Sequence, residues 1–130
     1  MTKKELIENI VEYIHKVNNE LGNHYKENIY QNALYYEINN NGYIAQTEVI
    51  VPIFYKDFYV GFERADIVHY ENNNVKLIIE LKSQNQRLGS KEINQLRKYM
   101  TNLNCDKGIL VNFYESLEII NVTIDSYQKI

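Results

Sequence analysis

The chain has 130 residues, of which 45% are hydrophobic and 24% are charged, and its formal net charge is −3. This length and composition predict one globular domain over residues 1–130, and the negative charge argues against a tight, passive binder of nucleic acid. A single cysteine, no apolar run of membrane-helix length and no signal-peptide core predict an intracellular protein, cytoplasmic or nuclear, that is not secreted and has no membrane partner.

Helical periodicity dominates the first forty residues. Apolar residues recur at helical spacing over residues 1–20, and a second helix is expected over residues 26–40, where an Asn-rich segment with Gly42 ends it. Five strand-like runs follow, at residues 43–51, 53–55, 58–60, 65–70 and 75–82.

The last third of the chain reads as a helix between strands. A third helix is expected over residues 91–103, followed by strands at residues 107–113 and 117–124. The strand-helix-strand unit favours a parallel pairing across a right-handed crossover. The order α-α-β-β-β-β-α-β-β predicts a mixed α/β (α+β) domain.

Two of the strand-like runs each carry a carboxylate in their middle. If they form a hairpin centred on Asn73, Asp66 faces Glu80 and Arg64 faces Lys82. Side chains alternate along a strand, so these four are expected on one face, roughly 5 Å apart across the pair. The other face is expected to be core and comprises Ala65, Ile67, Leu77, Ile79 and Leu81.

The hairpin alone supports two interpretations. In one, a divalent cation between Asp66 and Glu80 offsets their repulsion. In the other, Arg64 and Lys82 neutralise the carboxylates as a solvated charge ladder. Hydrolysis of a phosphodiester by a metal ion needs acidic oxygens and a nearby cation to orient water or offset phosphate charge, and Lys82 is placed for that second task.

Three residues elsewhere extend the pattern. Glu27 lies near the start of the second helix, and Gln95 and Tyr99 are four residues apart on one face of the third. Each alone is ordinary: an acid in a first helical turn suits the helix dipole, and a Gln–Tyr pair is common helix surface.

Taken together, these residues resemble the PD-(D/E)XK nuclease superfamily, and more narrowly the small GxxExxY proteins. The resemblance covers residues 21–113. Its landmarks, in chain order, are His24-Tyr25-Lys26-Glu27-Asn28-Ile29-Tyr30, Val51-Pro52, Tyr55-Lys56, Gly61, Arg64-Ala65-Asp66, Glu80-Leu81-Lys82, Gln95 with Tyr99, and Gly108-Ile109-Leu110-Val111-Asn112-Phe113. His24 departs from the motif glycine, and Ala65 replaces the proline of the superfamily name.

The resemblance implies a restriction-endonuclease-like core, a central mixed sheet flanked by helices. It implies that Asp66 and Glu80 hold Mg²⁺ or Mn²⁺, with Glu27 as an accessory acid. Lys82 becomes the catalytic lysine. Gln95 and Tyr99, together with Arg64, are the residues expected to contact the substrate.

The function expected from this resemblance is metal-dependent hydrolysis of phosphodiester bonds in nucleic acid, with DNA ahead of RNA. The alternative is a catalytically inactive nuclease fold that acts as a dimeric nucleic-acid or protein interaction module. A homodimer is expected in either case, with the exposed part of the first helix and the tyrosines as candidate surfaces.

Overall fold

The computed structural model describes residues 2–130. Its elements, in chain order, are α1 (Lys3–Leu21), α2 (Glu27–Asn40), β1 (Ile44–Tyr55), β2 (Phe58–Glu71), β3 (Asn74–Lys82), α3 (Ser90–Asn102), β4 (Gly108–Asn112), β5 (Glu118–Val122) and β6 (Tyr127–Lys129). None of the helices within residues 2–130 combines the length and the apolar character that a membrane crossing requires.

The strands form one six-stranded sheet in the order β1-β2-β3-β4-β5-β6. Only β3 and β4 run parallel, and α3 connects them, as the strand-helix-strand pattern predicted. The other neighbouring strands are antiparallel. The mixed sheet flanked by helices confirms the predicted fold class.

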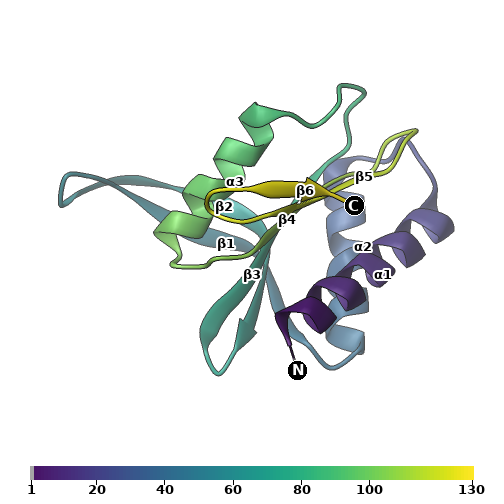
Figure 1. The fold of residues 1–130 in the computed structure, drawn as a ribbon, viewed down its shortest axis with the longest axis horizontal. Helices are drawn as coiled ribbons and strands as arrows, with labels where there is room; N and C mark the ends of the chain where they lie inside the picture. Colours follow the sequence, from purple (N-terminus) through teal and green to yellow (C-terminus); the bar gives the residue numbers. More distant parts are fainter. Residues whose placement is uncertain (1) are drawn as a thin grey trace.

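Helices cover the sheet on both sides, and Figure 1 shows α1 and α2 together on one side with α3 apart from them. Alternation along β3 produces the two cores: Leu77, Ile79 and Leu81 pack with α1 and α2. Ile78 instead packs with α3. A strand buried on both faces reads as a continuous apolar run, and for that reason Glu80 stands out in it.

The number and the bounds of the strands differ from the expectation in two respects. The runs at residues 43–51 and 53–55 form one strand, β1, and those at residues 58–60 and 65–70 form another, β2, so three strands precede α3. β1 continues through Pro52 because it is an edge strand, where a missing N–H breaks no ladder on the outer side. A sixth strand, β6, was not expected.

The far ends of β1 and β2 leave the body of the protein as a two-stranded ribbon, which Figure 1 shows projecting beyond α3. We call residues 50–62 the arm. Its turn is tight, with Lys56 in the left-handed region at φ 55°, and Tyr55 pairs with Phe58 across it. Residues 56–57 therefore form the hairpin turn that connects β1 to β2.

Gly108 sets how closely α3 approaches the sheet. A Cβ at this position would lie 2.9 Å from both Leu96 Cδ2 and Met100 Sδ. We expect Gly108→Val to lower the free energy of unfolding by about 1–3 kcal/mol, because it overpacks a filled core. Urea denaturation measures this. Gly89→Ala is the control, since its added carbon comes only to 4.0 Å of Glu92, and an equal loss in both variants contradicts the packing argument.

Candidate metal and nucleic-acid site

The β2–β3 ladder has the predicted register and stops at the predicted carboxylates. Ile67 pairs with Ile79 and Val68 with Ile78, which places Asp66 opposite Glu80. Beyond this point in the ladder, carboxylate oxygens replace backbone carbonyl oxygens as the acceptors of hydrogen bonds. The Asp66 N–H donates to Glu80 Oε1 at 2.7 Å, and the Leu81 N–H donates to Asp66 Oδ2 at 2.8 Å.

Each carboxylate is therefore anchored by one oxygen to the opposite strand. The remaining oxygens, Asp66 Oδ1 and Glu80 Oε2, accept no hydrogen bond from the backbone of residues 2–130. A carboxylate oxygen has lone pairs to spare for a cation when its partner oxygen holds the geometry. The pair is thus oriented by the sheet itself, without a turn or loop.

One part of the predicted face assignment is wrong. Ala65 was expected on the same core face as Ile67, but it packs with Val68 in the core beneath α3, whereas Ile67 packs with α1 and α2. The alternation of β2 shifts by one position at Asp66. The cause lies in the neighbouring strand, where Glu48, which would pair with Asp66, adopts φ 53° and leaves the ladder between Thr47 and Val49.

Glu48 is a site residue that the sequence analysis missed. It is exposed, and its charge acts on Asp66 strongly enough to raise the pKa of that carboxyl. An acidic residue inside the run at residues 43–51 was the only available signal. Its left-handed backbone, unusual for a glutamate in a strand, is visible only in the structure.

Burial raises the pKa of both paired carboxyl groups. The pKa of Asp66 rises from 3.8 to about 6, chiefly through burial and then through the charges of Glu27 and Glu48. The pKa of Glu80 rises well above its ordinary value, first through burial and then through the charge of Asp66. The nearby charge of Lys82 lowers both values without cancelling the rise. The pair therefore holds a proton readily when nothing else offsets its charge.

Glu27 is brought to the pair by the turn that precedes α2. Tyr30, which is fully buried and stacked on Phe113 at 4.4 Å between ring centroids, fixes this turn by donating its hydroxyl to Gly22 O at 2.6 Å. The Ser83 hydroxyl, just beyond Lys82, donates to Tyr25 O at 2.7 Å. These contacts tie the start of α2 to the end of β3, and the charge of Glu27 reaches Asp66.

The backbone at position 24, where the GxxExxY motif that the chain resembles has glycine, adopts a conformation that favours glycine. His24 adopts φ 76°, a left-handed conformation that glycine reaches without strain. Its imidazole lies on the surface, with Nε2 3.8 Å from Glu115 Oε1 and its ring edge-on to Tyr114. These exposed contacts offset little of the backbone strain.

Gln95 and Tyr99 lie beneath the carboxylates on α3. Gln95 Nε2 donates to the Tyr99 hydroxyl at 3.2 Å. Burial raises the pKa of Tyr99 to about 12, and the charges of Glu80, Glu63 and Asp66 add to the rise. Tyr99 is only 3% exposed, so it supports the site from below and Gln95 is the more accessible of the two.

Lys82 ends β3, and the loop after it is fastened to β4. Asn112, opposite Lys82 in the parallel ladder and 2% exposed, accepts from the Gln84 N–H at 3.1 Å and donates to Gln84 O at 3.0 Å. Its amide also donates to Gln86 O at 3.3 Å. The sequence analysis named Asn112 only as part of a motif and gave it no role, although a polar residue closing a buried apolar run was a usable signal.

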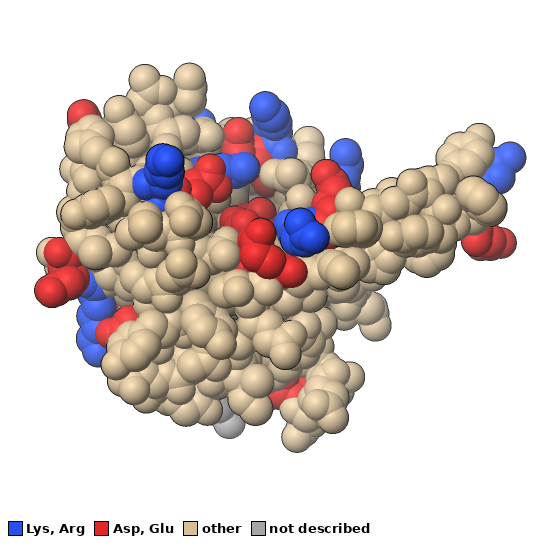
Figure 2. Space-filling view, turned by 180° about the vertical axis from the view of Figure 1, so that it is seen from behind, with Lys and Arg blue, Asp and Glu red and all other residues tan. Residues whose placement is uncertain are grey.

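Arg64 is not part of a charge ladder. Its guanidinium carbon lies 5.3 Å from the ring centroid of Phe62, and within residues 2–130 no ion pair joins it to either carboxylate. Because its neighbour Ala65 faces α3, Arg64 projects to the opposite side of β2, away from Tyr99. Figure 2 shows acidic and basic side chains gathered at the root of the projecting arm.

The two carboxylates suit a hard divalent cation that takes its remaining ligands from water or substrate. Within residues 2–130, no group of three or more His, Cys, Asp or Glu side chains is placed to hold a metal ion. Mg²⁺ commonly binds through one or two carboxylates and keeps waters or substrate phosphate for its other positions. Asp66 and Glu80, each with one oxygen uncommitted to the backbone and a pKa raised chiefly by burial, fit that mode.

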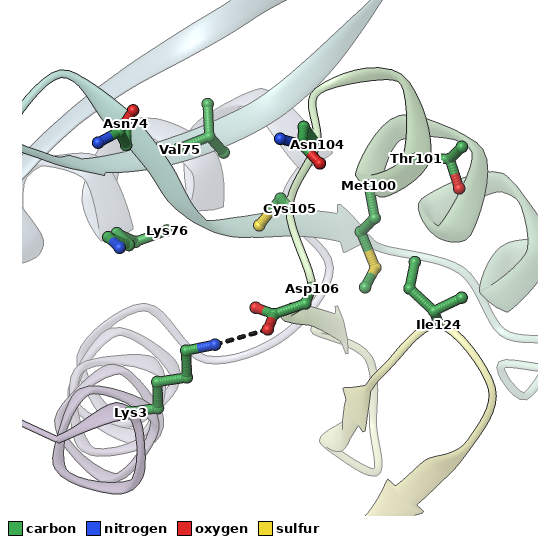
Figure 3. Close-up of a pocket in the computed structure, with 10 residues that line it drawn as sticks. All are labelled: Lys3, Asn74, Val75, Lys76, Met100, Thr101, Asn104, Cys105, Asp106 and Ile124. Carbon is green, nitrogen blue, oxygen red and sulfur yellow. Dashed lines mark hydrogen bonds and ion pairs between the residues drawn. The ribbon is translucent and has the colours of Figure 1, made fainter.

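A hollow of about 610 Å³ lies away from the carboxylates, at the other end of β3, as Figure 3 shows, between Asn74, Lys76 and the segment that follows α3. Lys3 and Asp106 close one side of it with an ion pair of 2.6 Å. None of the predicted site residues lines it.

Comparison with known proteins agrees with the fold. A family model described as the PD-(D/E)XK nuclease superfamily matches residues 4–122. The chain belongs to the PD-(D/E)XK nuclease superfamily. No curated protein and no solved structure matches it. The narrower resemblance to GxxExxY proteins stays a prediction.

Replacing Asp66 tests the cost of holding a charge that is buried and surrounded by other acids. Because the folded-state pKa is raised, the favourable protonated form is complete below about pH 4, and stability falls as the pH rises through about 6. Without divalent cations, the free energy of unfolding of Asp66→Asn should therefore be about 1–3 kcal/mol higher than that of wild type at pH 8. The difference should vanish toward pH 4. Asparagine still accepts from the Leu81 N–H.

Asp66→Ala is the matched control, since it removes the charge and the acceptor together and leaves the Leu81 N–H unpaired. Urea denaturation across pH compares the three proteins. If the asparagine variant is the less stable one at pH 8, the positive charge of Lys82 balances that of Asp66 and the pair needs no metal ion to offset it.

Replacing His24 tests the backbone strain at the turn before α2. His24→Gly should raise the free energy of unfolding by about 0.5–1 kcal/mol, because glycine adopts the left-handed conformation freely. His24→Ala removes the same surface contacts but keeps the strained Cβ, so it should bring no gain. Thermal or urea unfolding measures both, and equal stability of the two variants argues against strain at this position.

Proposed function

We propose that this chain is a metal-dependent nuclease that hydrolyses phosphodiester bonds of DNA or RNA, with DNA as the preferred substrate. The observation that carries the proposal is the pair Asp66 and Glu80, each anchored by one oxygen to the opposite strand, with Lys82 two residues beyond Glu80. Membership of the superfamily supports the same conclusion.

In this proposal Asp66 and Glu80 hold Mg²⁺ or Mn²⁺, and Glu27 accepts hydrogen bonds from waters at the site. The ion, when bound, supplies Lewis-acid polarisation of the phosphate and a more acidic water. A cation held by Asp66 and Glu80 would offset their negative charge, which burial and then the charge of Asp66 make costly at Glu80.

Lys82 supplies the positive charge that orients the attacking water or stabilises the charge developing on the phosphate. Two hydrogen bonds fasten the residues that follow Lys82: the Gln84 N–H donates to Asn112, and the Ser83 hydroxyl donates to Tyr25 O. Gln95 supplies an amide at the edge of the site, while Arg64, on the other side of β2, would contact a substrate backbone that continues past it.

The net charge of −3 gives nucleic acid little long-range attraction, so a bound cation would supply much of the local attraction for phosphate. Substrate binding that weakens when the cation is removed follows from this balance. The proposal includes a homodimer.

The decisive experiment incubates purified protein with Mg²⁺ or Mn²⁺ and single-stranded, duplex and branched DNA and RNA. Lys82→Ala should lower the cleavage rate at least about 100-fold by removing a charge that acts on the transition state. Lys98→Ala is the matched control, because Lys98 is exposed on α3, outside the set of residues described above.

A parallel titration with Mn²⁺ by calorimetry separates the two candidate functions. The nuclease binds the ion, and Asp66→Asn abolishes the binding. The alternative, a catalytically inactive module for nucleic acid or protein, is favoured by one observation: several large apolar side chains of the arm are exposed. Absence of both Mn²⁺ binding and cleavage across these substrates would favour the module and rule out the nuclease.

A further inference from the structure

The arm presents a continuous apolar face to solvent. Val51 is buried on the side of α3, and Val49 and Ile53 pack against the same core. The residues between them point the other way, and their cross-strand partners join them. This face, which we call the arm face, comprises Ile50, Pro52, Phe54, Tyr59 and Phe62.

A ring contact joins two of these residues, and all four large side chains are about half exposed. The rings of Phe54 and Tyr59 meet edge to face at 5.9 Å between centroids. The exposed fractions are 54% for Ile50, 57% for Phe54, 52% for Tyr59 and 46% for Phe62. Tyr55, Phe58 and Val60 near the tip are more than half exposed as well.

The protein itself does not cover this face. α1 and α2 lie on the same side of the sheet, but their core includes only Ala45 from β1 and Ile67 from β2. Both lie nearer the body than the arm. A large apolar ribbon standing in water costs free energy, and soluble proteins that keep one use it as an interface.

We propose that the arm face is the interface of a homodimer, in which the arm face of one copy packs against that of a second copy. Large apolar side chains bury about 150–250 Å² each, so the four half-exposed ones of the arm face expose on the order of 400 Å². That is about half of the roughly 800 Å² that each partner contributes to an interface of standard size, so the arm face would form the apolar centre of the interface.

Charge favours a second copy over nucleic acid. Residues 50–64 carry Lys56 and Arg64 against Asp57 and Glu63, so their charges balance within a protein of net charge −3. Both cations already lie over rings of the arm, Lys56 over Tyr55 and Arg64 over Phe62. Figure 2 shows the arm as tan between charged residues near its tip and charged residues at its root. Phosphate binding needs basic groups, and the five residues of the arm face include none.

The contact is made face to face, since the outer edge of β1 is unsuited to strand pairing. Pro52 has no N–H to donate, and Glu48 leaves the ladder with a left-handed backbone. Both features blunt an edge against addition of another strand. A twofold axis through the paired arm faces gives a closed, isologous dimer.

The arm also joins the interface to the candidate site, because β2 passes from Phe62 through Arg64 directly to Asp66. A dimer held by the arms therefore places two copies of the site on one assembly, each at the root of a shared apolar ribbon. The inference concerns assembly alone and does not depend on whether the site cleaves nucleic acid.

Light scattering coupled to gel filtration tests the proposal, with sedimentation equilibrium for the dissociation constant. Wild type should be a dimer at about micromolar concentration. Phe54→Asp with Phe62→Asp should raise the dissociation constant at least about 100-fold, since two buried aromatic anchors are lost to charge. Circular dichroism and thermal unfolding verify that this variant is folded, as expected for substitutions at half-exposed positions.

Two matched controls locate the interface. Tyr36→Ser on α2 and Tyr127→Ser on β6 remove tyrosines that are 65% and 53% exposed, comparable to those of the arm, and should leave the dimer intact. Asp66→Asn should also remain dimeric, which separates assembly from activity. A monomeric wild type at about 100 µM, a folded arm variant that stays dimeric, or dissociation by Tyr36→Ser alone overturns the proposal. An arm variant that loses oligonucleotide binding while wild type is monomeric assigns the arm to nucleic acid instead.

Discussion

Two backbone N–H groups in the middle of the sheet, those of Asp66 and Leu81, donate to carboxylates of the facing strand and not to carbonyl groups. Buried N–H groups must be hydrogen-bonded, so each carboxylate is a structural part of the sheet as well as a charge. The strands can part at this point only because the side chains replace the missing ladder. Everything else in the candidate site is arranged around these two bonds.

Several elements converge on this opening, each through a different contact. The start of α2 is tied to the end of β3 by the bonds of Tyr30 and Ser83, and this brings the charge of Glu27 to Asp66. From the side of α3, Tyr99 lies close enough for the charge of Glu80 to raise its pKa. Asn112 then holds the loop that begins after Lys82. Such convergence on a rigid sheet is the means by which a small protein orients charges without long loops.

The same distortion that makes the opening also divides β2 into two parts with different exposures. After Asp66 in the chain, β2 lies between the two cores, with Ile67 on one side and Val68 on the other. Before Asp66, one side of β2 still faces α3 through Ala65, while the other side has no helix to cover it and becomes the arm face. The exposed apolar ribbon and the acidic opening thus both lie along β2, which together with β1 extends beyond the helices.

From the order of amino acids alone, periodicity placed all three helices, the β2–β3 register and the parallel β3–β4 pair, since these depend on local patterns and on the handedness of short connections. The pairing of Asp66 with Glu80 followed from the position of the turn. The strand count was wrong, because Pro52 and the polar residues near Gly61 look like breaks when the position of a strand within the sheet is unknown.

Other features were decided by contacts between residues distant in the chain. The shift of Ala65 to the α3 side depends on the left-handed Glu48 in the neighbouring strand. The place of Arg64 over Phe62 follows from that shift. The reach of Asn112 to the loop after Lys82 depends on a parallel pairing across α3. Local sequence specifies which residues can form an element, whereas packing between elements determines which side of the sheet each side chain meets and which surfaces stay uncovered.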